Sequence, residues 1–413
     1  MLQEHRPNVL IAALDPPCTV ARIPAMLRVG ASRVAALCPR DTSLAHSWLV
    51  DRRVTIERDE SAALAALRGA ISREHFDLIV IGDEALLHAL SRSPEPWVER
   101  VLPFRTDAET RRLILDKNAM LRAVAARGVL VPPFLTVASD AELPHAAEEI
   151  GYPLVLKDAA GCAGAGVRRV DRSDELSTAY ASLARVGEVA VQRFVGGRPG
   201  CTEVLFDHGV PRCWTSALML EQWPTAFAGC TVRRPIARPG VEMMLHAVGA
   251  ATGFHGLGGI DWLEDDEGRL YFLEFNARVT HVVGPARRAF GAEFAAMMAG
   301  SPPAPHAVEL PGRTVPVFPR HLIRALKSRP ADVLQWLPFR QTSADLDWRD
   351  VGVVASELGN LAAAGVRRMI PRWISAAARS LRSRPARRAA ALRPRRSSAP
   401  AAVRLPATRR RPR

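Results

Sequence analysis

Short apolar runs alternate with helix-like stretches along the first hundred residues of the chain. The runs are nearly continuous and bounded by turn residues, which is typical of strands buried in a parallel sheet. Stretches such as "DESAALAALRGAISREH" separate them and favour helices. We therefore expect a doubly wound α/β unit over residues 1–105. Its strands are predicted at Asn8–Leu14, Arg33–Cys38, Arg53–Glu57 and Asp77–Gly82. The first strand is followed by "LDPPCT" rather than Gly-x-Gly-x-x-Gly, so a Rossmann dinucleotide site is not expected.

The pattern changes after residue 105. "DAETRRLILDKNAMLRAVAARG" predicts one helix that ends at Gly128, before Pro132 and Pro133. From there to residue 300 strands dominate, with helices expected at Ser173–Arg185 and Pro239–Gly253. We therefore predict a second unit over residues 106–300, a C-terminal extension over 301–357 and a tail over 358–413.

The basic charge of the chain lies in the tail. The formal net charge is +14, and residues after Glu357 include sixteen arginines and no acid. The body is therefore close to neutral. Residues 366–381 repeat apolar positions at helical spacing, so we expect an amphipathic helix followed by a disordered segment. That helix either contacts an anionic membrane surface or a partner, or packs on the body. Aromatic residues are too few for base stacking, so no specific nucleic-acid partner is expected.

The six cysteines are scattered, without a Cys-x-x-Cys pair or a nearby histidine at metal-ligand spacing. This usage favours reduced thiols, and no apolar run approaches about 18 residues. We therefore expect a cytoplasmic protein. The sequence does not indicate its oligomeric state.

The stretch "YFLEFNAR", Tyr271–Arg278, carries polar side chains on a strand. Strict alternation would place Phe272, Glu274, Asn276 and Arg278 on one face. If "DEGR" forms the tip of a hairpin closed by Asp265 and Leu270, then Asp261 lies opposite Glu274, roughly 5 Å away. Two carboxylates at this distance repel each other unless a cation lies between them. Oxygen ligands of this kind suit Mg²⁺. Alternatively, the polar residues form a solvated edge.

A second informative stretch is "YPLVLKDAAGCAGAGVRRV", Tyr152–Val170. Lys157 ends an apolar strand, and glycines follow it in a loop. Glycines let backbone N–H groups approach an anion, and the lysine adds a positive charge, so a phosphate accounts for both features. A flexible turn is the alternative. The loop does not match the Walker pattern.

Taken in order, these motifs resemble the ATP-grasp superfamily. They are Lys117 in "DKNAM", Lys157 with its glycine loop, "VAVQRFVGG", Asp261 and "LEFNAR". The likeness covers residues 8 to 300 and is greatest to the carboxylate–amine ligase and biotin-carboxylase-like branches. It implies an α/β (α+β) fold. A doubly wound pre-ATP-grasp domain precedes an ATP-grasp fold with a glycine-rich lid subdomain, and a disordered basic tail follows.

The resemblance also implies roles for individual residues, with ATP and Mg²⁺ (or Mn²⁺) as cofactors. Lys157 and Arg278 would be catalytic, with Arg278 stabilising an acyl phosphate. Asp261, Glu274 and Asn276 would bind the metal. The nucleotide would be bound by Lys117, Lys157, the lid glycines Gly161, Gly164 and Gly166, the hinge Gln192, Arg193, Phe194 and Val195, and Glu203 at the ribose. Asp158 and Pro199 depart from the pattern that relatives often show after the lysine and at the ribose contact.

The implied reaction is ADP-forming ligation of a small carboxylate to an amine. For the acid substrate we consider His281, Arg287 and Arg288; the alternative for these arginines is an exposed helix. Asp83 and Glu84 follow a parallel strand, where they either meet a ligand or start a helix. Two other functions fit the same fold, namely a bicarbonate-activating carboxylase-like enzyme and a non-catalytic ATP-binding adaptor at a membrane.

Overall fold

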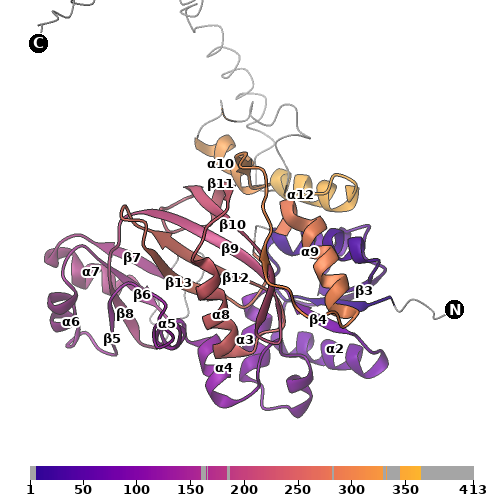
Figure 1. Cartoon of the computed structure of the whole chain (residues 1–413), viewed down its shortest axis with the longest axis horizontal. Helices are drawn as coiled ribbons and strands as arrows, with labels where there is room; N and C mark the ends of the chain where they lie inside the picture. The colour runs from indigo at the N-terminus through magenta and orange to yellow at the C-terminus, as the bar shows by residue number, and fades with distance from the viewer. Residues whose placement is uncertain are drawn as a thin grey trace, which may run out of the picture.

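The computed structural model describes residues 6–159, 164, 166–183, 187–280, 283–328, 332 and 345–363 (Figure 1). The chain forms three sheets: a parallel sheet at the N-terminus, a small antiparallel sheet, and a large sheet between them. The α/β class predicted from the sequence is confirmed.

The N-terminal sheet is parallel, in the order β3-β2-β1-β4. Its strands are β1 (Asn8–Ala12), β2 (Arg33–Pro39), β3 (Arg52–Ile56) and β4 (Leu78–Ile81), which confirms the four predicted strands. Its helices are α1 (Ile23–Leu27), α2 (Glu60–Arg73) and α3 (Glu84–Arg92), with short 3-10 turns η1 (Cys18–Arg22), η2 (Arg28–Gly30), η3 (Ser43–His46) and η4 (Pro96–Arg100). Because alternate strand residues belong to two different core clusters, both faces of the sheet are covered.

Asp83 joins the sheet to the start of α3. Its carboxylate accepts a hydrogen bond from the N–H of Leu86 (2.9 Å) as the N-cap, and others from Leu14 (2.6 Å) and Asp15 (3.1 Å) after β1. Asp83 is therefore a helix-starting residue that also fixes the loop after the first strand.

The helix predicted to run without a break to Gly128 is two helices, α4 (Ala108–Leu115) and α5 (Lys117–Ala125). Asp116 between them has extended backbone angles, and its side chain accepts hydrogen bonds from the N–H groups of Asn118 (2.9 Å) and Ala119 (3.2 Å). An aspartate competes with helix continuation in this way because its short side chain caps the next turn. As a result, Lys117 stands at the first position of a helix.

The small sheet is antiparallel, in the order β5-β8-β6-β7. It has its own apolar core, to which its two helices contribute. The predicted helix from Ser173 begins as the 3-10 turn η5 (Ser173–Glu175) and continues only to Ala181. The elements are β5 (Phe134–Val137), α6 (Leu143–Ile150), β6 (Leu154–Asp158), β7 (Val167–Val170), α7 (Leu176–Ala181) and β8 (Val189–Arg193).

The large sheet has the order β13-β12-β9-β10-β11-β15, and β14 pairs with β10. Its strands are β9 (Arg198–Asp207), β10 (Val210–Gln222), β11 (Cys230–Ile236), β12 (Gly256–Glu264), β13 (Leu270–Asn276), β14 (His306–Ala307) and β15 (Val315–Pro316). Helix α8 (Val241–Thr252) packs on the face that bears Val204 and Phe206. Helix α9 (Val283–Met298) packs on the opposite face, against Leu205, and also contacts α1.

The C-terminal elements are α10 (Arg320–Ser328) and α12 (Val351–Ala363). Helix α12 passes the position where the sequence predicted the tail to begin, and Leu361 is buried against the N-terminal unit. The amphipathic helix and the rest of the predicted tail lie outside the described residues. Within the described part of the chain, no helix is both long and apolar enough to cross a membrane.

Candidate active site

A cavity of about 510 Å³ lies between the small sheet and the large sheet. The loop after β1 reaches it through Pro17. The structure brings most of the expected site residues to this one space, although they come from α5, both sheets and the strand connections. Those that line it are Lys117, Lys157, Gly164, Gln192, Arg193, Phe194, Val195, Asp261, Glu274, Asn276 and Arg278.

Asp261 on β12 lies directly opposite Glu274 on β13, as the predicted register requires. The predicted closing pair is wrong, however, because Leu270 pairs with Glu264 rather than Asp265. A β-bulge reconciles the two findings, since β13 has one residue more than β12 beside Asp261 and Leu273 is left without a partner.

The bulge also corrects the predicted faces of β13. Phe272 is fully buried in the core with Phe275, whereas Leu273 and Glu274 both line the cavity. Strict alternation is lost because the two residues of a bulge oppose a single partner residue. The acid therefore points into the cavity while the phenylalanines pack beneath α8.

The electrostatics of the carboxylate pair indicate a cation site. Burial and the nearby Glu274 carboxylate raise the pKa of Asp261. Burial opposes ionisation of Glu274 as well, but Lys117 and Lys157 hold its pKa below the ordinary value. The Asn276 side chain lies beside Glu274, with its Nδ2 3.4 Å from Oε1. Two acids and one amide supply the oxygen ligands that Mg²⁺ prefers, so this donor set fits the metal.

Two lysines flank the pair. Lys117 Nζ lies 2.9 Å from Glu274 Oε2, an ion pair that raises the pKa of Lys117 although burial opposes it. Lys157 stands on β6, on the small-sheet side of the cavity, where burial and the charge of Lys117 lower its pKa to about 8. Glu274 can neutralise only one of the two lysines. The remaining positive charge faces the cavity and favours an anionic ligand.

Arg278 connects the site to the N-terminal unit. Its Nη2 and Nε donate to Glu84 Oε1 at 2.9 and 3.2 Å. Glu84 starts α3, just beyond the carboxyl end of β4. Of the two alternatives predicted for Glu84, the structure shows the helix start, since Glu84 lies in the first turn of α3. Glu84 also orients the cavity arginine.

The connection after β8 forms one wall of the cavity. The N–H of Arg193 donates to Pro133 O (2.8 Å) and that of Phe194 to Pro153 O (3.1 Å), so this segment is fixed to both neighbouring strand starts. The Arg169 guanidinium lies over the Phe194 ring, 4.1 Å from its centroid. Gln192 is buried, and its Nε2 has no hydrogen-bond partner among the described residues. An amide donor that is buried at a cavity wall is suited to a polar ligand.

The glycines of the lid loop have different positions. Gly164 has φ +78°, and a Cβ there would lie 2.2 Å from Phe227 O, so only glycine lets the loop pack on the β10–β11 connection. Gly166 is buried, and its carbonyl accepts from the N–H of Asp158 (2.9 Å). Gly161 lies outside the described residues. Asp158 is buried and lines the cavity.

Three residues that were expected to contact the nucleotide or the acid substrate do not line the cavity. Glu203 is fully buried, and its carboxylate accepts from both the N–H and the hydroxyl of Thr280, so it is not placed to contact a ribose. Arg287 lies beside Asp347, 3.7 Å away, in a separate small cavity, and Arg288 is exposed. Both arginines follow the site residues in sequence, but they belong to α9, which places them away from the cavity. His281 lies outside the described residues.

Among the cavity residues missed by reasoning from the sequence are two arginines, Arg233 on β11 and Arg320 at the start of α10. The only available signal for Arg233 was the alternation in "CTVRRPI", which places Arg233 and Arg234 on opposite strand faces but does not say which face meets the cavity. The register of this strand depends on β10, which is distant in sequence, so the strand alone could not reveal which arginine points inward.

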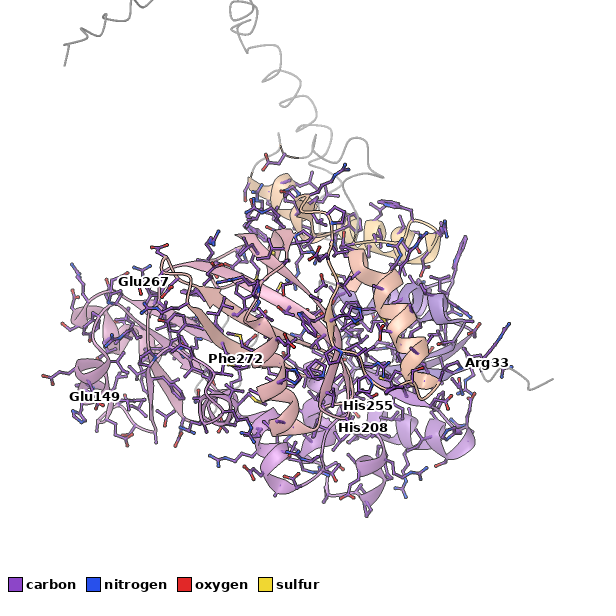
Figure 2. All side chains as sticks on the ribbon, in the orientation of Figure 1. Arg33, Glu149, His208, His255, Glu267 and Phe272 are labelled. Carbon is purple, nitrogen blue, oxygen red and sulfur yellow. The ribbon has the colours of Figure 1, made fainter. Side chains whose placement is uncertain are left out.

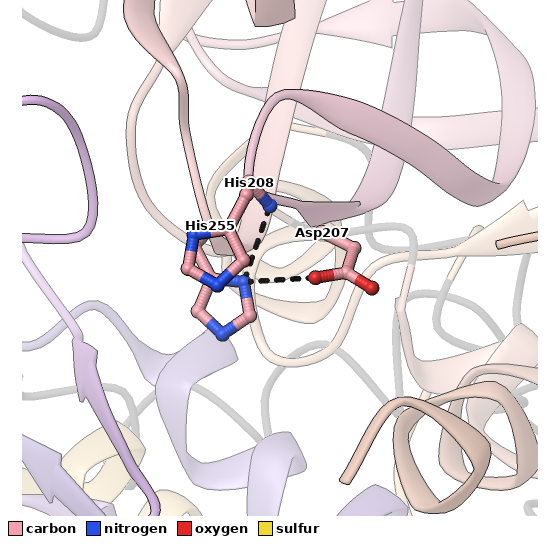
Figure 3. Close-up of side chains that lie close together, drawn as sticks. All are labelled: Asp207, His208 and His255. Carbon is pink, nitrogen blue, oxygen red and sulfur yellow. Dashed lines mark hydrogen bonds and ion pairs between the residues drawn. The ribbon is translucent and has the colours of Figure 1, made fainter. Parts of the chain in front are cut away.

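A second group of titratable side chains lies at the other end of the large sheet from the hairpin tip at Glu267 (Figure 2). Asp207, His208 and His255 offer ligand atoms within 4.8 Å of one another (Figure 3). However, the two imidazole rings are stacked, with centroids 4.1 Å apart and planes at 14°, and Arg212 pairs with Asp207 at 3.1 Å. A metal lies near the plane of an imidazole that binds it, so this stacked arrangement is a packing contact rather than a formed metal site.

Comparison with known proteins agrees with this geometry. Residues 114–282 match the family described as ATP-grasp domain. D-alanine–D-alanine ligase from Neisseria gonorrhoeae is 28% identical over 172 residues, which cover 39% of this chain and 57% of that protein. The chain thus spans little more than half the length of this relative.

Two solved structures share the fold. Biotin carboxylase from Campylobacter jejuni superposes with a TM-score of 0.57 and 19% identity, over 73% of this chain and 72% of that one. L-amino acid ligase from Bacillus licheniformis superposes with a TM-score of 0.52 and 19% identity, over 72% of this chain and 76% of that one. At these identities the likeness concerns the architecture.

Proposed function

Since residues 114–282 of this chain match the ATP-grasp domain family, we propose that the protein is an ADP-forming ligase that activates a small carboxylate as an acyl phosphate and joins it to an amine. The observation that supports this proposal is the convergence on one cavity of an acid pair, two lysines and an arginine: Asp261, Glu274, Lys117, Lys157 and Arg278.

The nucleotide would lie between the two sheets. The segment Gln192–Val195 would hold the base, because Gln192 offers a buried unpartnered donor and Phe194 and Val195 offer apolar surface. Lys117 and Lys157 would bind the phosphates, with the Gly164 loop closing from the small sheet. Leu273, which the bulge turns into the cavity, adds a further apolar contact.

The acid pair would hold the metal. Asp261 and Glu274 would coordinate Mg²⁺ with Asn276 at the edge, and Lys117 would leave Glu274 for a phosphate oxygen. When bound, Mg²⁺ would neutralise phosphate charge and so favour phosphoryl transfer. A cation between the two carboxylates would also offset the burial and the repulsion by Glu274 that raise the pKa of Asp261.

In the proposed reaction a carboxylate oxygen bonds to the γ-phosphorus of ATP, and the bond to the β-phosphate oxygen breaks to release ADP. The amine nitrogen then bonds to the acyl carbon, phosphate leaves, and the amine proton passes to the released phosphate. Arg278, held by Glu84, would stabilise the charge on the transferred group. Positioning and charge neutralisation carry the chemistry, so no side-chain nucleophile is required.

A second candidate is a bicarbonate-activating enzyme. The architectural likeness to biotin carboxylase over 73% of this chain favours it. It would use the same ATP and metal residues and differ in the acceptor. Stimulation of ADP release by bicarbonate, without an amine, would distinguish it from the ligase. The third function, a non-catalytic adaptor, is disfavoured because the acid pair and both lysines are present together.

The test is ADP release with Mg²⁺ and pooled small carboxylates and amines. The ligase predicts release that needs both pools and is lost in Glu274→Ala. Glu267→Ala is the matched control, because Glu267 belongs to the same hairpin but lies exposed at its tip. Equal release by the two variants, or release with neither pool required, would contradict the proposal.

A further inference from the structure

The cavity contains a buried arginine for which the described part of the chain supplies no partner. Arg233 is 0% exposed and lines the cavity, and none of its three guanidinium nitrogens has a hydrogen-bond partner there. A buried charge without a partner costs several kcal/mol, so proteins retain one only where something else compensates it. Arg234, the next residue, points to the opposite side and is exposed.

Two acidic groups, Glu203 and Asp345, interact with the charge of Arg233, and Asp345 Oδ1 has no hydrogen-bond partner among the described residues. Glu203 gives its oxygens to Thr280, and burial raises its pKa to about 8, which favours the neutral form at pH 7. Asp345 accepts from the N–H of Phe318 (3.2 Å) and lies 3.7 Å from Arg22. Neither acid forms an ion pair with Arg233.

The thiols around Arg233 do not supply negative charge either. Burial raises the pKa of Cys201 well above its ordinary value and that of Cys230 to about 11. Met219 is the strand partner of Arg233 on β10. The neighbouring strand residues Cys201, Met219 and Cys230 are therefore apolar or neutral, and an ion pair with a ligand would be strong beside them.

A second arginine faces the same end of the cavity. Arg320 starts α10, and its Nη1 would lie 1.7 Å from a Cβ at Gly229, so the absence of a side chain there makes room for the guanidinium. Its charge acts on the thiols of Cys18 and Cys230. This end of the cavity therefore has two cations from different elements, close to the loop after β1.

The two ends of the cavity are separated across the sheet. The order β12-β9-β10-β11 puts Arg233 three strands from Asp261, or roughly 14 Å between strand axes at ~4.8 Å per step. The phosphates and the carboxylate being activated would occupy the β12–β13 end. An anion bound at Arg233 would therefore be a different group from the one being activated.

We propose that Arg233 and Arg320 form a subsite for a second carboxylate of the substrates, one that is not activated by ATP. This inference rests on the proposed ligation for its place in the reaction. The carboxylate belongs either to a dicarboxylic acid substrate or to an amino acid that serves as the amine. A guanidinium fork matches a carboxylate in both cases.

The test uses binding without ATP, so its result does not depend on catalysis. Thermal unfolding of wild type, Arg233→Met and Arg234→Met is measured with C3 to C6 dicarboxylates, with monocarboxylates of the same lengths, with amino acids and with their amides. Potassium chloride at equal ionic strength is the reference. Arg234→Met is the matched control from the exposed side of the same strand.

Dicarboxylates or amino acids are expected to raise the unfolding midpoint of wild type and Arg234→Met more than the monocarboxylates and amino acid amides, which have one carboxylate fewer. Arg233→Met is expected to bind about 10- to 100-fold more weakly, the effect of losing a hydrogen bond to a charged group. The responding pool identifies whether the acid or the amine carries the second carboxylate.

The unfolding midpoint without ligand provides an independent readout. A purely structural arginine would make Arg233→Met unfold at a lower temperature. An arginine kept for a ligand predicts an equal or higher midpoint, because the variant removes an uncompensated buried charge.

Two binding results would overturn the inference: neither dicarboxylates nor amino acids exceed potassium chloride with wild type, or Arg233→Met responds as wild type does. Failure of the proposed function would appear separately, as ADP release unchanged in Glu274→Ala. ADP release that is equally fast with monocarboxylates and amino acid amides would keep the ligase and remove the subsite.

Discussion

Replacing Glu357 tests how the C-terminal helix is attached to the body. Glu357 on α12 is 1% exposed and Arg22 before α1 is 5% exposed, and they form a two-pronged ion pair in which Nη2 lies 3.1 Å from Oε2. Arg22 also donates to the carbonyls of Cys18 and Phe318, each at 2.9 Å. Glu357→Ala would leave the guanidinium buried without its principal carboxylate.

Removing one partner of a buried pair costs about 3–5 kcal/mol. The two carbonyls and Asp345, 3.7 Å from Arg22, remain, so we expect the lower end, about 3 kcal/mol. With an unfolding entropy of about 2.1 cal/mol/K per residue over about 330 described residues, the midpoint would fall by roughly 4 °C. Differential scanning calorimetry measures both quantities.

Two further variants separate the pair from its surroundings. Arg22→Met with Glu357→Leu removes both charges and should recover part of the loss, since a buried pair gains little over apolar packing. Recovery should be incomplete because two carbonyls lose their donor. Asp174→Ala removes one side of an exposed pair, whose side chains are 71% and 66% exposed, and should leave the midpoint unchanged. If Glu357→Ala shifts the midpoint no more than Asp174→Ala does, the reasoning is refuted.

Three other perturbations have defined outcomes. The pKa of Lys157 is lowered to about 8, by burial and then by Lys117, so the nucleotide-free protein loses this charge as pH rises through 8. ATP affinity measured calorimetrically should fall above pH 8, with proton uptake on binding, and a flat profile from pH 7 to 9.5 would contradict this. Gly249→Ala should destabilise, because its Cβ would lie 1.9 Å from Gly209 O, whereas Gly359→Ala in α12 meets nothing within 4 Å and should stabilise by up to about 1 kcal/mol. Equal unfolding midpoints for these two variants would refute that packing argument. We also propose that the arginine-rich tail contacts anionic membranes. Deletion of residues 364–413, which leaves α12 intact, should abolish association with phosphatidylserine liposomes at low salt without changing the unfolding midpoint; association equal to that of the full chain would remove the membrane contact.

The sequence was sufficient for features that depend on local pattern. The four parallel strands, the lysine at the end of β6 and the opposition of Asp261 and Glu274 follow from apolar runs and hairpin geometry. The bulge at Leu273 could not be predicted because it depends on how β13 packs beneath α8 and against β12. The break at Asp116 was missed for a local reason. The residues around Asp116 favour a helix, but its side chain caps the next helix instead.

The substrate side of the site was the least predictable part. Arg287 and Arg288 follow the metal strand in sequence, but α9 turns them away from the cavity. Arg233 and Arg320 come from segments on either side of α9 and meet only through the pairing of β11 with β15. Their convergence results from long-range sheet topology, which a single sequence does not reveal.

The central claim is that Asp261 and Glu274 bind ATP through a metal, and calorimetric titration of ATP with and without Mg²⁺ tests it most directly. The account predicts that wild type and Glu267→Gln bind ATP more tightly with Mg²⁺, and that Glu274→Gln, which keeps the shape but loses the charge, shows no such gain. An equal gain with Mg²⁺ in Glu274→Gln, or no ATP binding by wild type, would contradict it.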